Sequence, residues 1–131
     1  MCLASIVMTE AIVPRIVDFA SGAAETSVSK PPADRLLAGN PEHKTHNYFS
    51  DSSGRFFSGV WESTPGRWRI SYTENEFCHL TRGRIRIADS EGREWTFKAG
   101  DSFVIPAGFT GTWEVLEPTA KLYAIYEPAA S

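Results

Sequence analysis

The chain has 131 residues, a formal net charge of −3 and an isoelectric point near 5.6. This length suits one domain with a substantial core, and the scattered basic residues exclude an electrostatic footprint for nucleic acid or an anionic membrane. Two cysteines, Cys2 and Cys78, do not make a disulfide framework, so we expect reduced thiols in a cytoplasmic protein.

The N-terminal stretch, residues 1–8, is apolar but lacks a basic leading region and is too short to span a bilayer. We therefore expect neither export nor membrane anchoring. Met8 offers a second plausible start, which would make the first seven residues either a start-site artefact or a leader. Amino-terminal sequencing of natively expressed protein would decide between them.

Residues 11–19 predict a short peripheral strand interrupted by Pro14, which cannot donate to a ladder. Residues 20–41 are rich in Ser, Ala, Gly and Pro and predict an irregular segment, in which residues 34–37 can add one short element. The predicted division is an N-terminal arm over residues 1–41 and a β-domain over residues 42–131. A peripheral strand with an unpaired edge favours a homodimer.

From residue 43 onward, short alternating segments are separated by turn signals, including Arg82-Gly83 and Glu117-Pro118, with no sustained helical period. About nine regularly spaced strands are typical of an antiparallel sandwich or barrel. The predicted strands cover residues 43–49, 55–62, 67–73, 76–80, 84–88, 94–98, 102–105, 111–116 and 121–127.

Two motifs within this β-region resemble the conserved motifs of the cupin superfamily. They read Glu76-x6-Gly83 and Gly100-Asp101-x4-Pro106-x-Gly108, and the resemblance extends over residues 45–128. The resemblance implies an all-β, RmlC-like cupin jelly roll, that is, a double-stranded β-helix barrel.

A finer pattern resembles the cupin subfamily of ureidoglycine aminohydrolase-like and ethanolamine-utilisation-type proteins. It reads Trp68-x3-Tyr72-x-Glu74-x-Glu76, Gly108-x2-Gly111-x-Trp113 and Lys121-x-Tyr123. This likeness implies a compact, often dimeric cupin with an altered bowl, and it does not imply a particular activity.

The usual cupin metal site contains three histidines and a glutamate, and the resemblance places those histidines at Ile70, Tyr72 and Gly111. Only Glu76 is kept, and one carboxylate cannot hold a first-row transition metal. We therefore predict no metal in that site and no cofactor. The missing side chain at Gly111 is expected to leave room for a substrate.

Strand alternation and the motif alignment place Ile70, Tyr72, Glu76 and Cys78 inside the bowl, with Trp113 on a facing strand. Desolvation would raise the pKa of Glu76 unless a cation or Tyr72 stabilises the anion. Glu76 is therefore either a general acid/base or a residue that fixes the bowl by hydrogen bonding. Tyr72 either contacts a ligand or fills the bowl as an aromatic plug.

Four further residues are candidate ligand contacts. Trp113 either stacks on a planar ligand or belongs to the core, and Glu74 either reaches the mouth of the site or is exposed in its turn. Lys121 either pairs with Glu74 or Glu76 or is an ordinary strand-end charge. Cys78 lies beside Glu76, but His79 points away from it, so an inert buried thiol competes with a role at the site.

His43 and His46 are three residues apart on one predicted strand, which puts them on opposite faces. They cannot form a pair, but one of them can approach the bowl and partner Glu76 in a non-standard metal site.

These residues predict a cupin that binds a small polar metabolite. It would act either as a metal-independent enzyme in which Glu76 moves a proton on a nitrogenous or carboxylated substrate, or as a non-catalytic binding or regulatory module. A purely structural role would have the bowl plugged by Trp113 and Tyr72.

Overall fold

The computed structural model describes residues 13–129, and these residues form strands, turns and loops without a helix. None of them therefore provides a helix long and apolar enough to cross a membrane. The strands are β1 (Glu25–Ser29), β2 (Leu36–Gly39), β3 (His43–Ser50), β4 (Phe56–Ser63), β5 (Gly66–Ser71), β6 (Asn75–Asp89), β7 (Glu94–Lys98), β8 (Ser102–Ile105) and β9 (Thr110–Tyr126).

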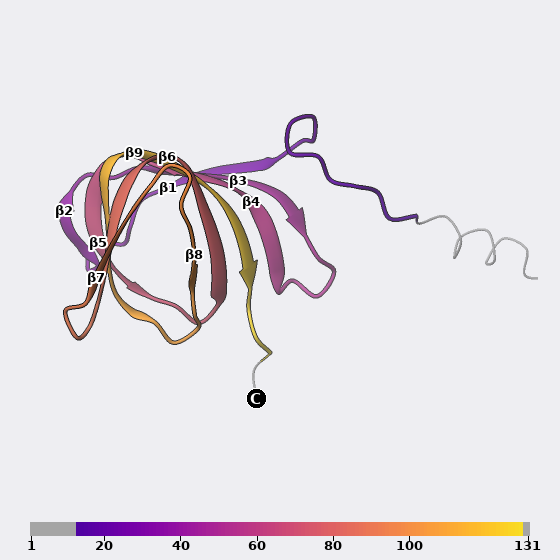
Figure 1. The fold of residues 1–131 in the computed structure, drawn as a ribbon. Coiled ribbons are helices and arrows are strands. Elements are labelled where there is room, and N and C mark those ends of the chain that lie inside the picture. Colours follow the sequence, from indigo (N-terminus) through magenta and orange to yellow (C-terminus); the bar gives the residue numbers. More distant parts are fainter. Residues whose placement is uncertain (1–12, 130–131) are drawn as a thin grey trace, which may run out of the picture.

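Two long strands, β6 and β9, pair along their length, and each pairs on its other edge with shorter strands. The sheet built on this pair curls into a barrel (Figure 1). The C-terminal half of β9 pairs with β4, which continues to β3 and β1, whereas its N-terminal half pairs with β5, which continues to β2. Similarly, β6 pairs with β8 near its start and with β7 near its end. All pairings are antiparallel, and the predicted all-β jelly-roll barrel is confirmed.

The strand boundaries differ from the prediction at the two bends of the barrel. Arg82-Gly83 and Glu117-Pro118 do not end strands, because β6 and β9 run through both sites with shifts of register between Leu80 and Ile85. Gly83 has φ of 91°, and a side chain there would meet Pro118 and Thr119 of the adjoining strand. The turn signals therefore mark bulges, which bend a strand without terminating it.

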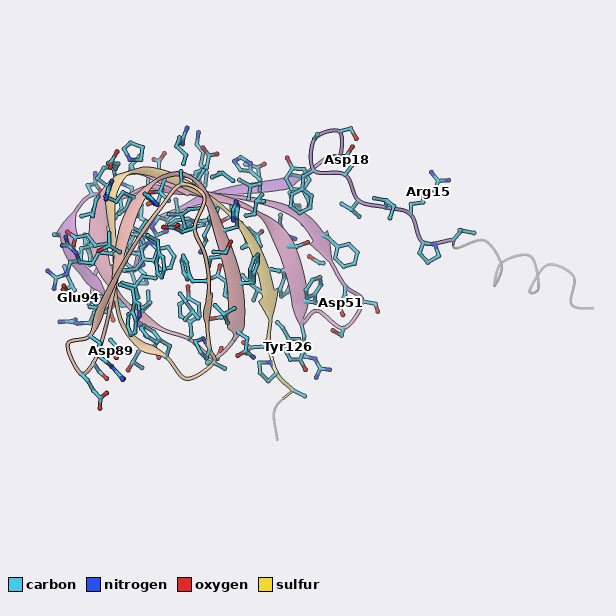
Figure 2. The ribbon with its side chains drawn as sticks, in the orientation of Figure 1. Arg15, Asp18, Asp51, Asp89, Glu94 and Tyr126 are labelled. Atoms are coloured by element: carbon cyan, nitrogen blue, oxygen red, sulfur yellow. The ribbon has the colours of Figure 1, made fainter. Side chains whose placement is uncertain are left out.

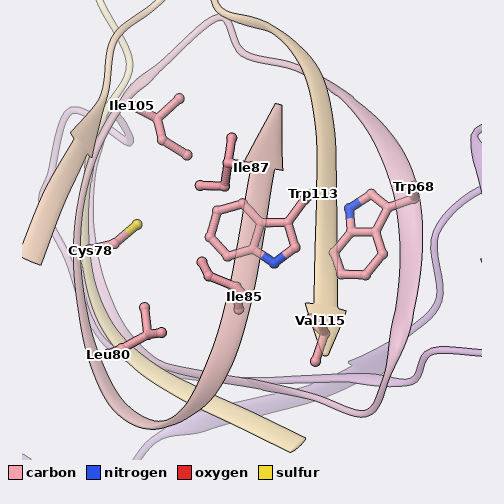
Figure 3. Close-up of a cluster of buried hydrophobic side chains, with 8 residues drawn as sticks. All are labelled: Trp68, Cys78, Leu80, Ile85, Ile87, Ile105, Trp113 and Val115. Carbon is pink, nitrogen blue, oxygen red and sulfur yellow. The ribbon is translucent and has the colours of Figure 1, made fainter. Parts of the chain in front are cut away.

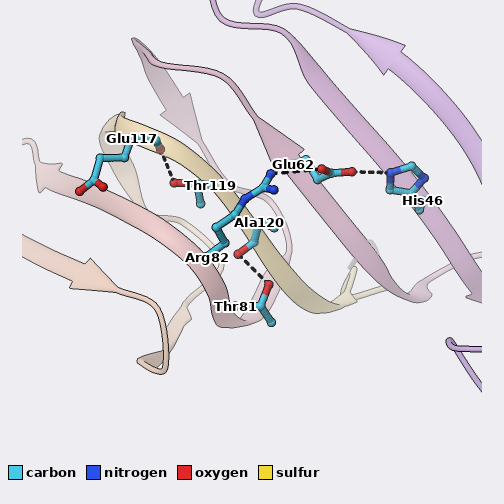
Figure 4. Close-up of polar contacts among 7 residues, drawn as sticks. All are labelled: His46, Glu62, Thr81, Arg82, Glu117, Thr119 and Ala120. Atoms are coloured by element: carbon cyan, nitrogen blue, oxygen red, sulfur yellow. Dashed lines mark hydrogen bonds and ion pairs between the residues drawn. The ribbon is translucent and has the colours of Figure 1, made fainter.

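Hydrogen bonds from two threonine side chains also stabilise the bend of β6 and β9. Thr119 Oγ1 donates to the carbonyl oxygen of Glu117 at 2.8 Å, and Thr81 Oγ1 donates to that of Ala120 at 3.3 Å (Figure 4).

The N-terminal region also differs from its prediction. Residues 13–18 have no regular structure, so the peripheral strand is wrong over 13–19, while residues 11 and 12 lie outside the described part. The segment that carries Arg15 runs away from the barrel (Figure 2), and Ile16 is 93% exposed. The homodimer inferred from that strand stays a prediction.

The irregular segment predicted over residues 20–41 is wrong at Glu25–Ser29, which form a strand, whereas the short element expected in it is found. β1 adds to β3 at one end of the sheet, and β2 adds to β5 at the other end. β2 overlaps the short element expected at 34–37.

The hydrophobic core lies inside the barrel between the facing strands (Figure 3). Strand alternation puts Cys78 and Leu80 on the inner side of β6 before the bend, and Ile85 and Ile87 on its inner side after the bend. On the outer side, Arg86 pairs with Glu114 of β9 at 3.3 Å. The remaining core residues are Trp68, Ile105, Trp113 and Val115.

Candidate functional site

A pocket of about 720 Å³ opens within the barrel, along the inner surface of the β1–β3–β4–β9 sheet and beside β5. Five of the predicted site residues line it: Tyr72, Glu74, Glu76, Trp113 and Lys121. The other lining residues are Glu25, Arg35, His43, Thr45, Asn47, Ser50, Phe57, Trp61, Trp68, Arg69, Ile70, Ser71, Tyr123 and Ile125.

A buried ion pair lies in this pocket. Lys121 Nζ donates to Glu76 Oε2 at 2.8 Å, and the two side chains are 6% and 4% exposed. The pair forms because β6 and β9 are adjacent and both residues face inward. Of the alternatives for Lys121, pairing with Glu76 is the one found.

Tyr72 uses the second oxygen of the same carboxylate. Its hydroxyl donates to Glu76 Oε1 at 2.7 Å, so both carboxylate oxygens of Glu76 accept a hydrogen bond from the protein. Burial and the neighbouring Glu76 raise the pKa of Tyr72 well above its usual range, which keeps the phenol a hydrogen-bond donor. This geometry matches the interpretation in which Glu76 fixes the shape of the bowl.

Two tryptophan rings flank the ammonium of Lys121. Its Nζ lies 4.7 Å from the ring centroid of Trp61 and 4.5 Å from that of Trp113, within cation–π range. Burial by itself lowers the pKa of Lys121, but the adjacent Glu76 and Cys78 outweigh it and raise the pKa. The ammonium therefore stays charged and held in place.

His43 packs against the same aromatic group. Its ring centroid lies 5.1 Å from that of Trp61 and 4.6 Å from that of Trp68, with both rings tilted. Burial and then the charge of Lys121 lower the pKa of His43 to about 4, so the ring is neutral at neutral pH. Its Nε2 atom is buried and finds no hydrogen-bond partner among residues 13–129.

His46 lies on the opposite face of β3, as predicted. Its Nε2 contacts Glu62 Oε2 at 2.7 Å, and Glu62 also accepts from Arg82 at 3.3 Å on the outside of the barrel (Figure 4). His46 therefore cannot approach the pocket.

Two of the predicted contacts have mixed roles. Trp113 is 2% exposed and belongs to the core, yet it also lines the pocket, and its Nε1 is unpartnered within the described chain. Glu74 is half-buried at the pocket, and burial followed by repulsion from Glu127 and Glu76 raises its pKa.

Cys78 and Gly111 do not line the pocket. Cys78 is fully buried with its Sγ 3.7 Å from Lys121 Nζ, and burial raises the pKa of its thiol to about 12. A side chain at Gly111 would collide with the backbone of Ala88 on β6. The expectation that Gly111 makes room for a substrate is therefore wrong, because the glycine permits close strand packing.

His43 reaches the pocket but completes no metal-ligand set. Within residues 13–129, no group of three or more His, Cys, Asp and Glu side chains is arranged to hold a metal ion.

Several pocket residues were missed from the sequence. Trp61 pairs directly with Lys121 across β4 and β9, and Tyr123 donates from its hydroxyl to Asn47 Oδ1 at 2.8 Å. The available signal was strand alternation, which puts Trp61 and Phe57 on one face of β4 and Tyr123 and Lys121 on one face of β9.

Comparison with known proteins gave a family match and several matches of fold. The family model for the EutQ-like cupin domain matches residues 50–123. No curated protein matches the chain.

A solved structure from Pseudomonas syringae pv. tomato str. DC3000, a DUF861 family protein of unknown function, is 24% identical with a TM-score of 0.71. The match covers 80% of this chain and 45% of that protein. The Clostridium difficile EutQ protein is 23% identical with a TM-score of 0.60, covering 72% of this chain and 71% of that one. Identities this low show a common fold and nothing finer.

Proposed function

The chain belongs to the EutQ-like cupin domain family, and on that premise we propose that it binds a small polar metabolite in the pocket around Glu76 and Lys121. Tyr72, Glu74 and Trp113 are the further residues assigned to contact the ligand or to shape its site. The Clostridium difficile protein carries the name EutQ, and that name implies no activity for this chain.

The observation that supports this proposal is a buried ion pair in an open pocket. Glu76 and Lys121 are each less than one-tenth exposed, and taking two charges out of water costs several kcal/mol per ion. Well-packed apolar side chains of similar volume often stabilise a protein as well as such a pair or better. Charged groups kept at this cost, inside a cavity with room for a small molecule, are typical of binding and catalytic sites.

A metal-independent enzyme is the second candidate. Tyr72, Glu76 and Lys121 form one continuous chain of hydrogen bonds, so a substrate that displaced Tyr72 from Glu76 Oε1 would meet a carboxylate able to accept a proton. Binding without turnover requires no such displacement, so we place the binding module first.

A thermal-shift screen of amino, ureido, carboxylic and neutral aromatic compounds tests binding, because a ligand at one hundred times its Kd stabilises the folded state by about 2.7 kcal/mol. Hits should lose affinity in Tyr72→Phe, which changes an assigned contact in the pocket, and keep it in His46→Gln, which changes a residue on the outer face of β3. Turnover of a hit that disappears in Glu76→Gln would favour the enzyme. A screen without hits, or hits whose affinity Tyr72→Phe leaves unchanged, would reject the pocket as the site.

A further inference from the structure

We infer that the inner part of this pocket selects an uncharged planar group, an aromatic or conjugated amide ring, which lies against the His43–Trp61–Trp68 rings and hydrogen-bonds to His43 Nε2. This inference rests on the proposed function, because it names the class of ligand for the same pocket.

The first argument is charge balance. The buried charges of the pocket are the ammonium of Lys121 and the carboxylate of Glu76, and they contact each other at 2.8 Å. Tyr72 takes the remaining carboxylate oxygen, and two indole rings cover the ammonium. A ligand that brought a further charge to this depth would find no free counter-charge, and an unpaired buried charge is strongly unfavourable.

The charged residues elsewhere along the pocket do not change this balance. Arg35, Arg69 and Glu25 are exposed, so water screens them. Glu74 is half-buried, and its pKa is raised by burial, which shows that its surroundings disfavour a charge.

The second argument is the shape and chemistry of the wall. His43, Trp61 and Trp68 form a compact set of rings whose centroids are 4.6 to 6.2 Å apart. Flat apolar faces of this kind favour planar ligands through offset or edge contacts. Since the pocket lies beside them, a planar ring can cover this wall more completely than a puckered one.

The third argument is the unsatisfied hydrogen-bonding atom at the wall. His43 Nε2 is buried and lacks a partner in the part of the chain that the structure describes. A buried polar atom without a partner costs about 1–3 kcal/mol, which a ligand atom can recover. Because the ring is neutral, it serves an uncharged donor or acceptor, the group that an amide or a phenol carries.

The test titrates the full chain with four probes at pH 7 and follows pocket side chains by NMR. Benzamide is the neutral planar probe, benzoate and benzylammonium add a charge to the same ring, and cyclohexanecarboxamide removes the planarity. We expect benzamide to bind about tenfold or more tightly than each of the other three. His43→Phe, which keeps a ring but removes its nitrogens, should weaken benzamide about three- to tenfold, the effect of one hydrogen bond.

His46→Gln is the matched control, because it changes a histidine on the outer face of the same strand, and it should leave benzamide affinity unchanged. Pocket binding of benzoate or benzylammonium as tight as that of benzamide would overturn the inference and leave the proposed function standing. Binding of cyclohexanecarboxamide alone would do the same. Absence of pocket NMR shifts with all four probes would also overturn it, whereas the proposed function is rejected only by the metabolite screen, through a flat response or through hits whose affinity Tyr72→Phe leaves unchanged.

Discussion

Lys121 Nζ and Glu76 Oε2 lie 2.8 Å apart, although the two residues are far apart in sequence and both are nearly closed to solvent. Mutation of either residue alone leaves the other without its counter-charge. The Lys121→Met variant should therefore lose about 3–5 kcal/mol of unfolding free energy, because it leaves the Glu76 carboxylate buried and unpaired. Urea unfolding followed by fluorescence measures the loss.

The double variant Lys121→Met/Glu76→Met is the matched control for this prediction. It removes both charges, so it should recover most of the stability lost in the single variant. Equal losses in the single and the double variant would show that the pair does not couple.

His43 should make the protein less stable on mild acidification. Burial followed by the charge of Lys121 lowers its pKa from 6.5 to about 4, so between these values the unfolded chain binds a proton that the folded chain does not. The contribution of His43 to the free energy of unfolding is therefore complete above pH 6.5 and falls as the pH drops toward 4. Since the ring is half-buried, screening limits the effect to about 1–2 kcal/mol.

Unfolding experiments across this pH range should show a shallower acid slope in His43→Phe than in the wild type. An NMR titration of the His43 ring protons gives the folded-state pKa directly. A midpoint near 6.5 in the folded protein would contradict this prediction.

Gly83 should tolerate a side chain much less well than Gly92, although both have positive φ. At Gly83 a Cβ atom would meet Pro118 and Thr119, whereas at Gly92 no described atom lies within 4 Å of it. Gly92→Ala should cost about 1–2 kcal/mol through its backbone conformation, and Gly83→Ala should cost at least 2 kcal/mol more, as roughly expected for added steric overlap. Thermal unfolding of the two variants separates the steric cost from the conformational one, and similar losses would refute the close packing at the bend.

The bend at Gly83 separates what could be predicted from the sequence from what could not. Alternation correctly put Glu76 and Cys78 on an inner face, because that pattern is local to a strand. It could not separate a turn from a bulge at Arg82-Gly83, since the same residue types serve both. β1 formed despite its unpromising composition, because pairing with β3 overrides weak local preference.

The pocket was predicted in part for a similar reason. Tyr72 and Glu76 stand on or beside one strand with a recognisable motif, so their inward position was accessible from the sequence. The contribution of His43 and Trp61 depends on β3 and β4 extending the sheet from β9, and that strand order is a non-local property.

Cys78 should be chemically silent in the native protein. Burial raises the pKa of its thiol to about 12 against the opposing charge of Lys121, and its side chain has no exposed surface. Because the thiolate is the reactive form, a thiol reagent at pH 8 should label Cys78 only when the barrel opens. A Cys2→Ser background leaves Cys78 as the only thiol, and full labelling in denaturant provides the reference.

In that background, Lys121→Met should speed native labelling by about a hundredfold or more, because a loss of about 3 kcal/mol raises the open population by that factor if opening is global. Gly92→Ala, with its smaller loss, should speed it by roughly tenfold. Rapid labelling of the unmutated barrel, at a rate that does not follow stability, would instead show that the pocket gives the reagent access to Cys78. That result would restore the thiol as a candidate for chemistry at the site.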